Sequence, residues 1–167
     1  MYQMKHDLLT QPRADVIGIR NARLADSMDR MHQATQAHGP VKGPRFMALH
    51  TRCDNMVDAA EDARDLLAER VAQVGGMAEG TIQVATARTG LQGYPLMLAE
   101  ERAHGEARAS ALAAYGRCVR QGIAQADALG TGTRHMFTQI SRGVDTSRWC
   151  VEAHRGSSAR QETSACP

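Results

Sequence analysis

Residues 44–74 read PRFMALHTRCDNMVDAAEDARDLLAERVAQV, and this stretch decides the fold. Pro44 suits the first position of a helix, and the Gly-Gly pair directly after Val74 is a typical helix stop. Apolar and small side chains recur at steps of three and four, as on the buried side of a long helix. The predicted core positions are Phe46, Leu49, Cys53, Met56, Val57, Ala60, Ala63, Leu67, Val71 and Val74.

A helix over residues 14–38 is predicted to precede this one. Ile17, Leu24 and Met31 recur every seven positions, which is typical of a core-facing stripe. His38 falls next on the same stripe. The Gly-Pro pair that follows ends the helix, because proline cannot continue it, so we expect a short turn between the two helices.

The Gly-rich residues 75–95 are too many for a tight turn and predict a crossover that contains a short helix at 81–88. Helices over 96–128 and 133–154 should follow, separated by the sequence ALGTGT. Two helical pairs joined by one long connection are typical of the ferritin-like arrangement. We therefore predict an all-α, ferritin-like four-helix bundle with a short crossover helix between the second and third helices.

Length and composition agree with a single helical domain. The chain has 167 residues, few aromatic side chains and a net charge of +2, which is too small to indicate a nucleic-acid or membrane partner by itself. We predict the bundle at 14–155, an N-terminal tail at 1–13 and a disordered C-terminal tail at 156–167. The four cysteines form no C-x-x-C pair, and no apolar stretch suits a signal peptide or a membrane span. Reduced thiols and a cytoplasmic location are expected.

Four polar side chains share one face of the helix at 44–74. At 100° per residue, His50, Asp54, Asp65 and Glu69 fall within about 100° of one another and away from the apolar side. His50 and Asp54 are one turn apart, as are Asp65 and Glu69, so each pair could bind one cation. Imidazole and carboxylate ligands suit iron or another first-row divalent ion.

A solvated acidic surface explains the same pattern. Asp58 and Glu61 lie on this side of the helix, and Asp62 lies just beyond. Charge runs on helices are usually solvated surface, and spacing alone favours that interpretation over a metal site. Periodicity therefore indicates a candidate site without choosing its ligands.

One copy of the helix cannot complete such a site, because the helical rise puts His50 and Glu69 about 28 Å apart. Residue numbers 50 and 69 average to 59.5, and so do 54 and 65. Two such helices crossing antiparallel about a two-fold axis at Ala59-Ala60 would bring His50 and Asp54 of one chain to Glu69 and Asp65 of the other. Two equivalent sites would result.

A family resemblance covers about residues 14–155. Residues 36–81 resemble the signature of the Dps mini-ferritins, the DNA-protection-during-starvation family, in which QAHW-N-x-x-G-x-x-F-x-x-x-H-x-x-x-D leads through D-x-x-x-AER to x-x-LGG. YPL at 94–96, FTQISRGVD at 137–145 and WCVEAH at 149–154 resemble the remaining landmarks of the family. The order and spacing of the motifs match throughout.

The resemblance implies an intersubunit ferroxidase site. Its ligands would be His38, His50 and Asp54 of one chain with Asp65 and Glu69 of its two-fold mate, and these residues would be both catalytic and metal-binding. The resemblance also implies a homo-dodecamer, built from two-fold dimers, that binds iron in a di-iron site. Such a cage takes up Fe(II), oxidises it preferably with hydrogen peroxide and stores ferric oxide, which protects DNA from oxidative damage.

Several residues depart from the family pattern. Gly39 and Pro40 stand where the family has Trp and usually Asn. Arg30, His32 and Arg52 stand where relatives usually carry apolar or neutral side chains, and burial there is costly unless the charge is paired. We therefore keep an alternative function, a DNA-compacting or structural cage with impaired ferroxidase activity.

Two further departures concern partners. Arg134 and His135 replace the Ala and Asp that the family commonly has near its three-fold pores, so we expect slower iron uptake. The N-terminal tail has only Lys5 and Arg13 against Asp7, whereas strong DNA binding needs many cationic contacts. DNA binding and nucleoid association are therefore weakly supported, although many tails on one cage could add avidity.

Overall fold

The computed structural model describes residues 9–38, 46–98, 100–129 and 133–162, except for the side chains of 46, 49, 101 and 154–162. None of the described residues lies in a strand. The all-α class is therefore confirmed. The described helices are α1 (Thr10–His38), α2 (Phe46–Gln73), α3 (Ile82–Arg88), α4 (Glu101–Ala128) and α5 (Arg134–Glu162).

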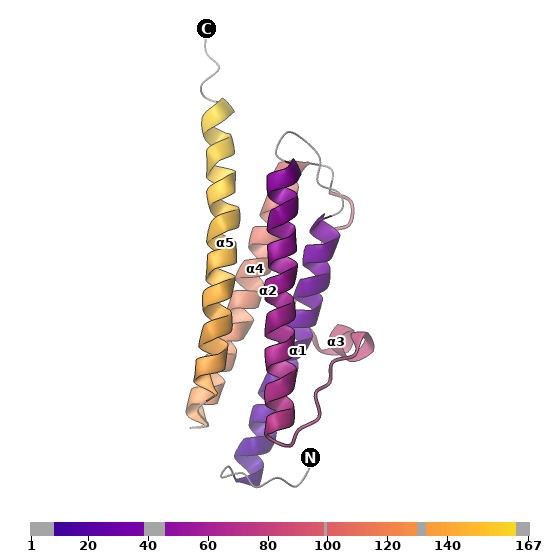
Figure 1. Ribbon diagram of the computed structural model, residues 1–167, viewed down its shortest axis with the longest axis vertical. Helices are drawn as coiled ribbons and strands as arrows, with labels where there is room; N and C mark the ends of the chain where they lie inside the picture. The colour runs from indigo at the N-terminus through magenta and orange to yellow at the C-terminus, as the bar shows by residue number, and fades with distance from the viewer. Residues whose placement is uncertain (1–8, 39–45, 99, 130–132, 163–167) are drawn as a thin grey trace.

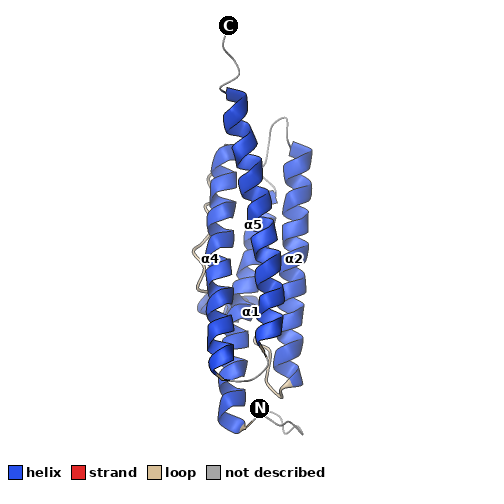
Figure 2. Cartoon of the chain, turned by 90° about the vertical axis from the view of Figure 1, so that its left-hand side faces the viewer, coloured by secondary structure: helices blue, strands red, loops and turns tan. Residues whose placement is uncertain are grey.

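The four long helices form two antiparallel pairs, with α1 packed along α2 and α4 packed along α5 (Figure 1). A long crossover leaves the end of α2 and reaches the opposite end of the bundle, where α4 begins, and α3 lies on it against α1. Figure 2 shows α4, α5 and α2 side by side from a second direction. The predicted ferritin-like bundle with a crossover helix is confirmed.

The core lies between the four long helices. Leu24, Leu67, Val119 and Phe137 are fully buried in it. Each such side chain contributes about 1.5–3 kcal/mol to folding. Of the predicted core of α2, Phe46 and Leu49 lie outside the described side chains and every other member is buried or half-buried. In the part of the chain that is described, no helix is long and apolar enough to cross a bilayer.

The Gly-Gly stop after α2 is confirmed. Gly75 has a φ of 75°, which favours glycine, and its N–H donates to Ala72 O at 2.8 Å. A Cβ on Gly76 would lie 2.8 Å from side-chain atoms of Ile17 and Val71. The absence of a side chain therefore lets α1 and the end of α2 approach closely.

Buried polar side chains of α1 fix the crossover. The Asn21 side chain donates to Met77 O at 3.0 Å, and Asp26 accepts a hydrogen bond from Gly90 N at 2.8 Å. Burial raises the pKa of Asp26, despite this hydrogen bond and the ion pair with Arg23 at 3.0 Å. Both ends of α3 are thus tied to α1, which explains why the buried side of α1 is unusually polar.

Helix α4 begins at Glu101 and not at 96, so the predicted start is wrong. His104 gives the reason. Its Nδ1 lies 2.9 Å from Tyr94 Oη, and its Nε2 lies 3.1 Å from Leu98 O. These contacts hold the preceding segment against the first turn of α4, so that segment does not continue the helix.

The other helix ends differ less from prediction. Helix α1 begins at Thr10, before 14, because Pro12 is tolerated in a first turn whose N–H groups have no helical acceptor. Helix α5 runs to Glu162, past the predicted end at 154. The expected features at Pro44, Gly39-Pro40 and 130–132 lie outside the described residues. The division into a domain at 14–155 with tails at 1–13 and 156–167 stays a prediction.

Candidate metal centre

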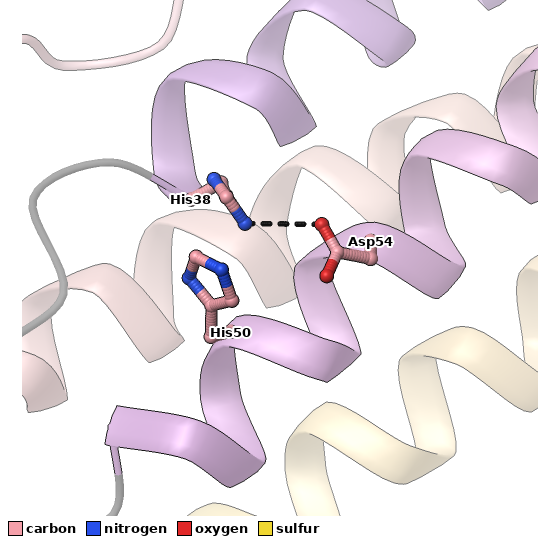
Figure 3. A group of neighbouring side chains, drawn as sticks. All are labelled: His38, His50 and Asp54. Carbon is pink, nitrogen blue, oxygen red and sulfur yellow. Dashed lines mark ion pairs between the residues drawn. The ribbon is translucent and has the colours of Figure 1, made fainter.

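Three of the five predicted ligands lie together on one chain. His38 is the last residue of α1, and His50 and Asp54 stand one turn apart on α2 (Figure 3). One candidate ligand atom of each residue lies within 4.8 Å of those of the other two. The packing of α1 along α2 therefore adds an imidazole to the pair that the helix repeat places on α2.

The contacts within this cluster suit a shared cation. His38 Nε2 lies 3.0 Å from Asp54 Oδ1, so the imidazole nitrogen and the carboxylate oxygen face one another (Figure 3). The rings of His38 and His50 have centroids 3.6 Å apart and are tilted by 34°. Metal–nitrogen and metal–oxygen bonds are each about 2.0–2.2 Å long, so two donors 3.0 Å apart can bind one ion.

The cluster opens to solvent. The side chain of His38 is 29% exposed and that of Asp54 is 53% exposed. A structural metal site is normally closed by its own chain, whereas a site that takes up an ion and passes it on keeps open positions. The geometry is that of an open group of three candidate ligands on an exposed helix face.

Asp65 and Glu69 are not brought to the cluster within one chain. Both are exposed farther along α2. Arg64 Nη2 lies 2.9 Å from Asp65 Oδ1 and 2.9 Å from Glu61 Oε1. The hydrogen bond to Asp65 is the largest cause of a raised pKa for Arg64. The sequence prediction missed this arginine, although a glutamate three positions before an arginine is a known helical pairing.

Similarity to known proteins identifies the family. The DNA protection during starvation protein of Agrobacterium fabrum (strain C58) is 34% identical over 154 residues, covering 92% of this chain and 95% of that protein. The chain belongs to the Dps family. No family model matches it.

Solved Dps structures share the fold. DpsA14 from Streptomyces coelicolor is 27% identical, with a TM-score of 0.85, and the match covers 90% of this chain and 89% of that one. Dps from Microbacterium arborescens, solved in its high iron form, is 24% identical with a TM-score of 0.80, covering 87% of this chain and 95% of that one. The five-helix arrangement is therefore the Dps arrangement.

The three basic residues that stand where Dps relatives usually carry apolar or neutral side chains differ in burial. Arg30 is 2% exposed, Arg52 is half-buried and His32 is exposed. The predicted cost of burying a charge therefore applies most strongly to Arg30. Exposed His32 does not belong to the group of described ligands formed by His38, His50 and Asp54.

A buried cysteine lies directly beside the cluster in sequence. Cys53 precedes Asp54 and is buried in the core. Its thiol is free, and so are the thiols of Cys118 and Cys150. Arg108 Nη1 donates to Cys53 Sγ at 3.0 Å. This contact links α4 to the ligand-bearing turn of α2 and so fixes the orientation of that turn.

The substituted segment at the start of α5 is also charged and exposed. Arg134 Nη1 lies 3.5 Å from Asp127 Oδ2, and His135 is exposed. The carboxylate of Asp127 is thus partly neutralised by its neighbour. Slower cation uptake at this end of the molecule stays a prediction.

Proposed function

We propose that this chain is a ferroxidase and iron-storage mini-ferritin that acts as a homo-dodecamer built from two-fold dimers. The observation that carries the proposal is the cluster of His38, His50 and Asp54, whose ligand atoms lie within 4.8 Å on an exposed face of a Dps fold. Neutral imidazoles and a carboxylate suit Fe(II). The substrate is iron, and its oxidation and storage protect DNA, which agrees with the name of the Agrobacterium relative.

The second half of the site comes from a neighbouring chain. Asp65 and Glu69 lie too far along α2 to reach the cluster on their own chain, at about 1.5 Å of rise per residue. Their positions mirror those of Asp54 and His50 about Ala59-Ala60. An antiparallel crossing of two α2 helices there produces two equivalent sites of five ligands each.

Two Fe(II) ions at each site account for the chemistry. Hydrogen peroxide takes one electron from each Fe(II), its O–O bond breaks, and both oxygens leave as hydroxide or water without release of a hydroxyl radical. The role of His38, His50, Asp54, Asp65 and Glu69 is to hold the two ions close together and leave coordination positions free for the oxidant. The high iron form of the Microbacterium relative agrees with iron as the cargo.

A second candidate is a DNA-compacting or structural cage with impaired oxidation. The observation that favours it is the ion pair between Arg64 and Asp65, which neutralises one of the five ligands. An exposed pair of this kind is worth about 0–1 kcal/mol, so a divalent ion displaces it readily. The oxidising cage is therefore preferred.

The two functions are separated by measuring native mass, anaerobic Fe(II) binding and peroxide-driven formation of Fe(III). We compare the wild type with Asp65→Ala/Glu69→Ala and with Asp58→Ala/Asp62→Ala, which removes equal charge from the same helix. The first variant should assemble normally but oxidise iron at least about tenfold more slowly, since ligands and their supporting groups typically matter by that factor. The second should behave as the wild type.

Equal oxidation rates in all three proteins would refute the assigned site. A wild-type dodecamer that neither binds Fe(II) nor oxidises it would favour the structural or DNA-compacting cage.

A further inference from the structure

Arg64 contacts the ligand face of α2, which is the side of this helix that carries His50, Asp54, Asp65 and Glu69. Its Nε donates to Asp65 Oδ1 at 2.9 Å, and its Nη2 donates to Glu61 Oε1 at 2.9 Å. Its Nη1 contacts Met31 Sδ of α1 at 3.7 Å, and a thioether is a weak acceptor. Two exposed carboxylates therefore hold the guanidinium, and its third nitrogen has a weak acceptor that a carboxylate can replace.

The other two arginines of α2 point elsewhere. At 100° per residue, Arg52 and Arg70 project about 150° away from the centre of the ligand face. Arg64 projects about 90° from this centre, and its long side chain bends toward the face to reach Asp65. Arg64 is therefore the arginine of α2 that can act on the predicted ligands.

The proposed two-fold dimer brings like charges together. Each shared site would place Asp65 and Glu69 of one chain against Asp54 of the other. Residue numbers 58 and 61 also average to 59.5, so Glu61 would lie level with Asp58 of the second chain. Like charges that face one another across an interface are costly. Without metal, pairing of the two chains therefore needs another cation at this place.

We propose that Arg64 is a positioning residue of the metal-free site, where its guanidinium lies between Asp65 of its own chain and Asp54 of a second copy until a divalent cation displaces it. The inference rests on the proposed function, because the antiparallel crossing of two α2 helices is what brings the second copy's Asp54 level with Asp65. A guanidinium has five N–H donors in one plane, so it can bind carboxylates on two sides at once.

Exposure of this contact lets metal replace the arginine. The side chain of Arg64 is 28% exposed and that of Asp65 is 60% exposed, and an exposed ion pair contributes little to stability. Imidazole and carboxylate groups bind a first-row divalent ion directly. Arg64 and the metal therefore compete for the same carboxylates, and Arg64 stabilises the pairing of chains only while metal is absent.

Stabilisation of α2 within one chain is the competing explanation. Arg64 lies three positions after Glu61, which is a stabilising helical spacing. Asp54 separates the two explanations, because it stands ten positions before Arg64 and so about 15 Å away along the helix. These two side chains cannot form an ion pair within one chain. Any energetic coupling between them therefore crosses the interface.

The test is dissociation of the metal-free, full-length assembly, followed by sedimentation over a dilution series in EDTA at a fixed low urea concentration. Arg64→Gln should separate into single chains at a protein concentration about five- to 25-fold higher than the wild type, since each dimer loses two exposed ion pairs. Arg64→Lys keeps the charge and should lie closer to the wild type. Arg70→Gln is the matched control, because Arg70 contacts Gln73 at 2.7 Å on another side of the same helix.

Two further measurements identify the partner and the competitor of Arg64. In an Asp54→Asn background the effect of Arg64→Gln should largely disappear, because the acceptor on the second copy is gone. Zn(II), which does not change its oxidation state, should remove the difference between Arg64→Gln and the wild type. Zn(II) should restore pairing even where Arg64→Gln stays a single chain in EDTA.

Equal dissociation of the wild type and Arg64→Gln in EDTA would overturn the proposal. A defect that is equally large in the Asp54→Asn background, or that Zn(II) leaves unchanged, would also overturn it, because the arginine would then act within its own chain. Failure of the proposed function looks different, since Zn(II) would bind Asp65→Ala/Glu69→Ala as tightly as the wild type. That result would refute the assigned site and this inference with it. None of these measurements depends on ferroxidase activity.

Discussion

His38 Nε2 lies 3.0 Å from Asp54 Oδ1, and this contact joins the last residue of α1 to the first half of α2. With His50 it gives each chain one assembled group of three candidate ligands. The remaining two, Asp65 and Glu69, stand farther along the same helix, where Asp65 pairs with Arg64. Three of the five ligands of the proposed site are thus already close together within one chain.

Mixing two inactive variants should restore activity if each site is shared between chains. His50→Ala/Asp54→Ala removes one half of the site, and Asp65→Ala/Glu69→Ala removes the other. In randomly paired dimers about half are mixed, and each mixed dimer holds one intact site of two, so about a quarter of the wild-type oxidation rate is expected. The measurement is peroxide-driven Fe(III) formation after the variants are dissociated together and reassembled.

Each variant reassembled alone is the control and should stay inactive. A mixture that is no more active than its components would show that the five residues do not act across a two-fold axis.

Removing Arg64 should strengthen metal binding. Metal must displace this guanidinium from Asp65, and an exposed ion pair of this kind is worth about 0–1 kcal/mol, so Arg64→Gln should raise Fe(II) affinity up to about fivefold. The gain should shrink at high salt, which already screens the pair. Anaerobic Fe(II) titration at two ionic strengths measures it. Arg142→Gln is the control, and an affinity that is unchanged in Arg64→Gln at low salt contradicts the prediction.

Two buried arginines should respond oppositely to removal. Arg20 donates to Arg70 O at 2.6 Å and to Thr133 Oγ1 at 2.8 Å, so Arg20→Met should lower the free energy of unfolding by about 1.5–3 kcal/mol. Arg30→Leu removes a charge whose Nε and Nη2 have no hydrogen-bond partner among the described residues, and should raise that free energy by about 1–3 kcal/mol. Urea unfolding at one fixed protein concentration tests both. A loss of stability in Arg30→Leu would mean that Arg30 has a partner after all.

The buried carboxyl of Asp26 predicts a pH dependence of stability. Its pKa is raised above the ordinary 3.8 by burial, so the folded state holds this proton to a higher pH than the unfolded state does. Stability from this group is therefore present below about pH 4 and is lost as pH rises toward the raised pKa. Asp26→Asn keeps an acceptor for Gly90 N but cannot titrate. The stability of the wild type relative to this variant should fall between pH 4 and neutral pH, and a constant difference would contradict the assignment.

The parts of the structure that follow from local repeats could be predicted from the sequence. The core of α2 depends on side chains three and four positions apart, and the pairing of His50 with Asp54 depends on one helical turn. The position of His38 beside them could also be predicted, because His38 continues the apolar stripe of α1, and α1 packs along α2. The approach of Asp65 and Glu69 to a second chain rests on the equal midpoints of residues 50 and 69 and of residues 54 and 65 along α2. It stays a prediction.

The parts that depend on distant contacts could not be predicted. The start of α4 is fixed by His104 through its contacts with Tyr94 and Leu98, and no periodicity reports such contacts. The burial of Arg30 beside a cavity depends on how far α2 stands from α5, which is a property of packing and not of either helix alone. Arg64 is different, because its spacing of three positions from Glu61 is a helical pairing that the sequence alone displays.

In the proposed cage, the exposure of His38 and Asp54 on a lone chain bears on assembly. Cu(II) and Zn(II) bind imidazole and carboxylate groups more tightly than Fe(II) does. A newly synthesised subunit therefore presents an open chelating group to whichever metal it meets first. In the proposed cage, pairing of subunits would complete the site around this group, so the order of folding, pairing and metal exposure would decide which metal is bound first.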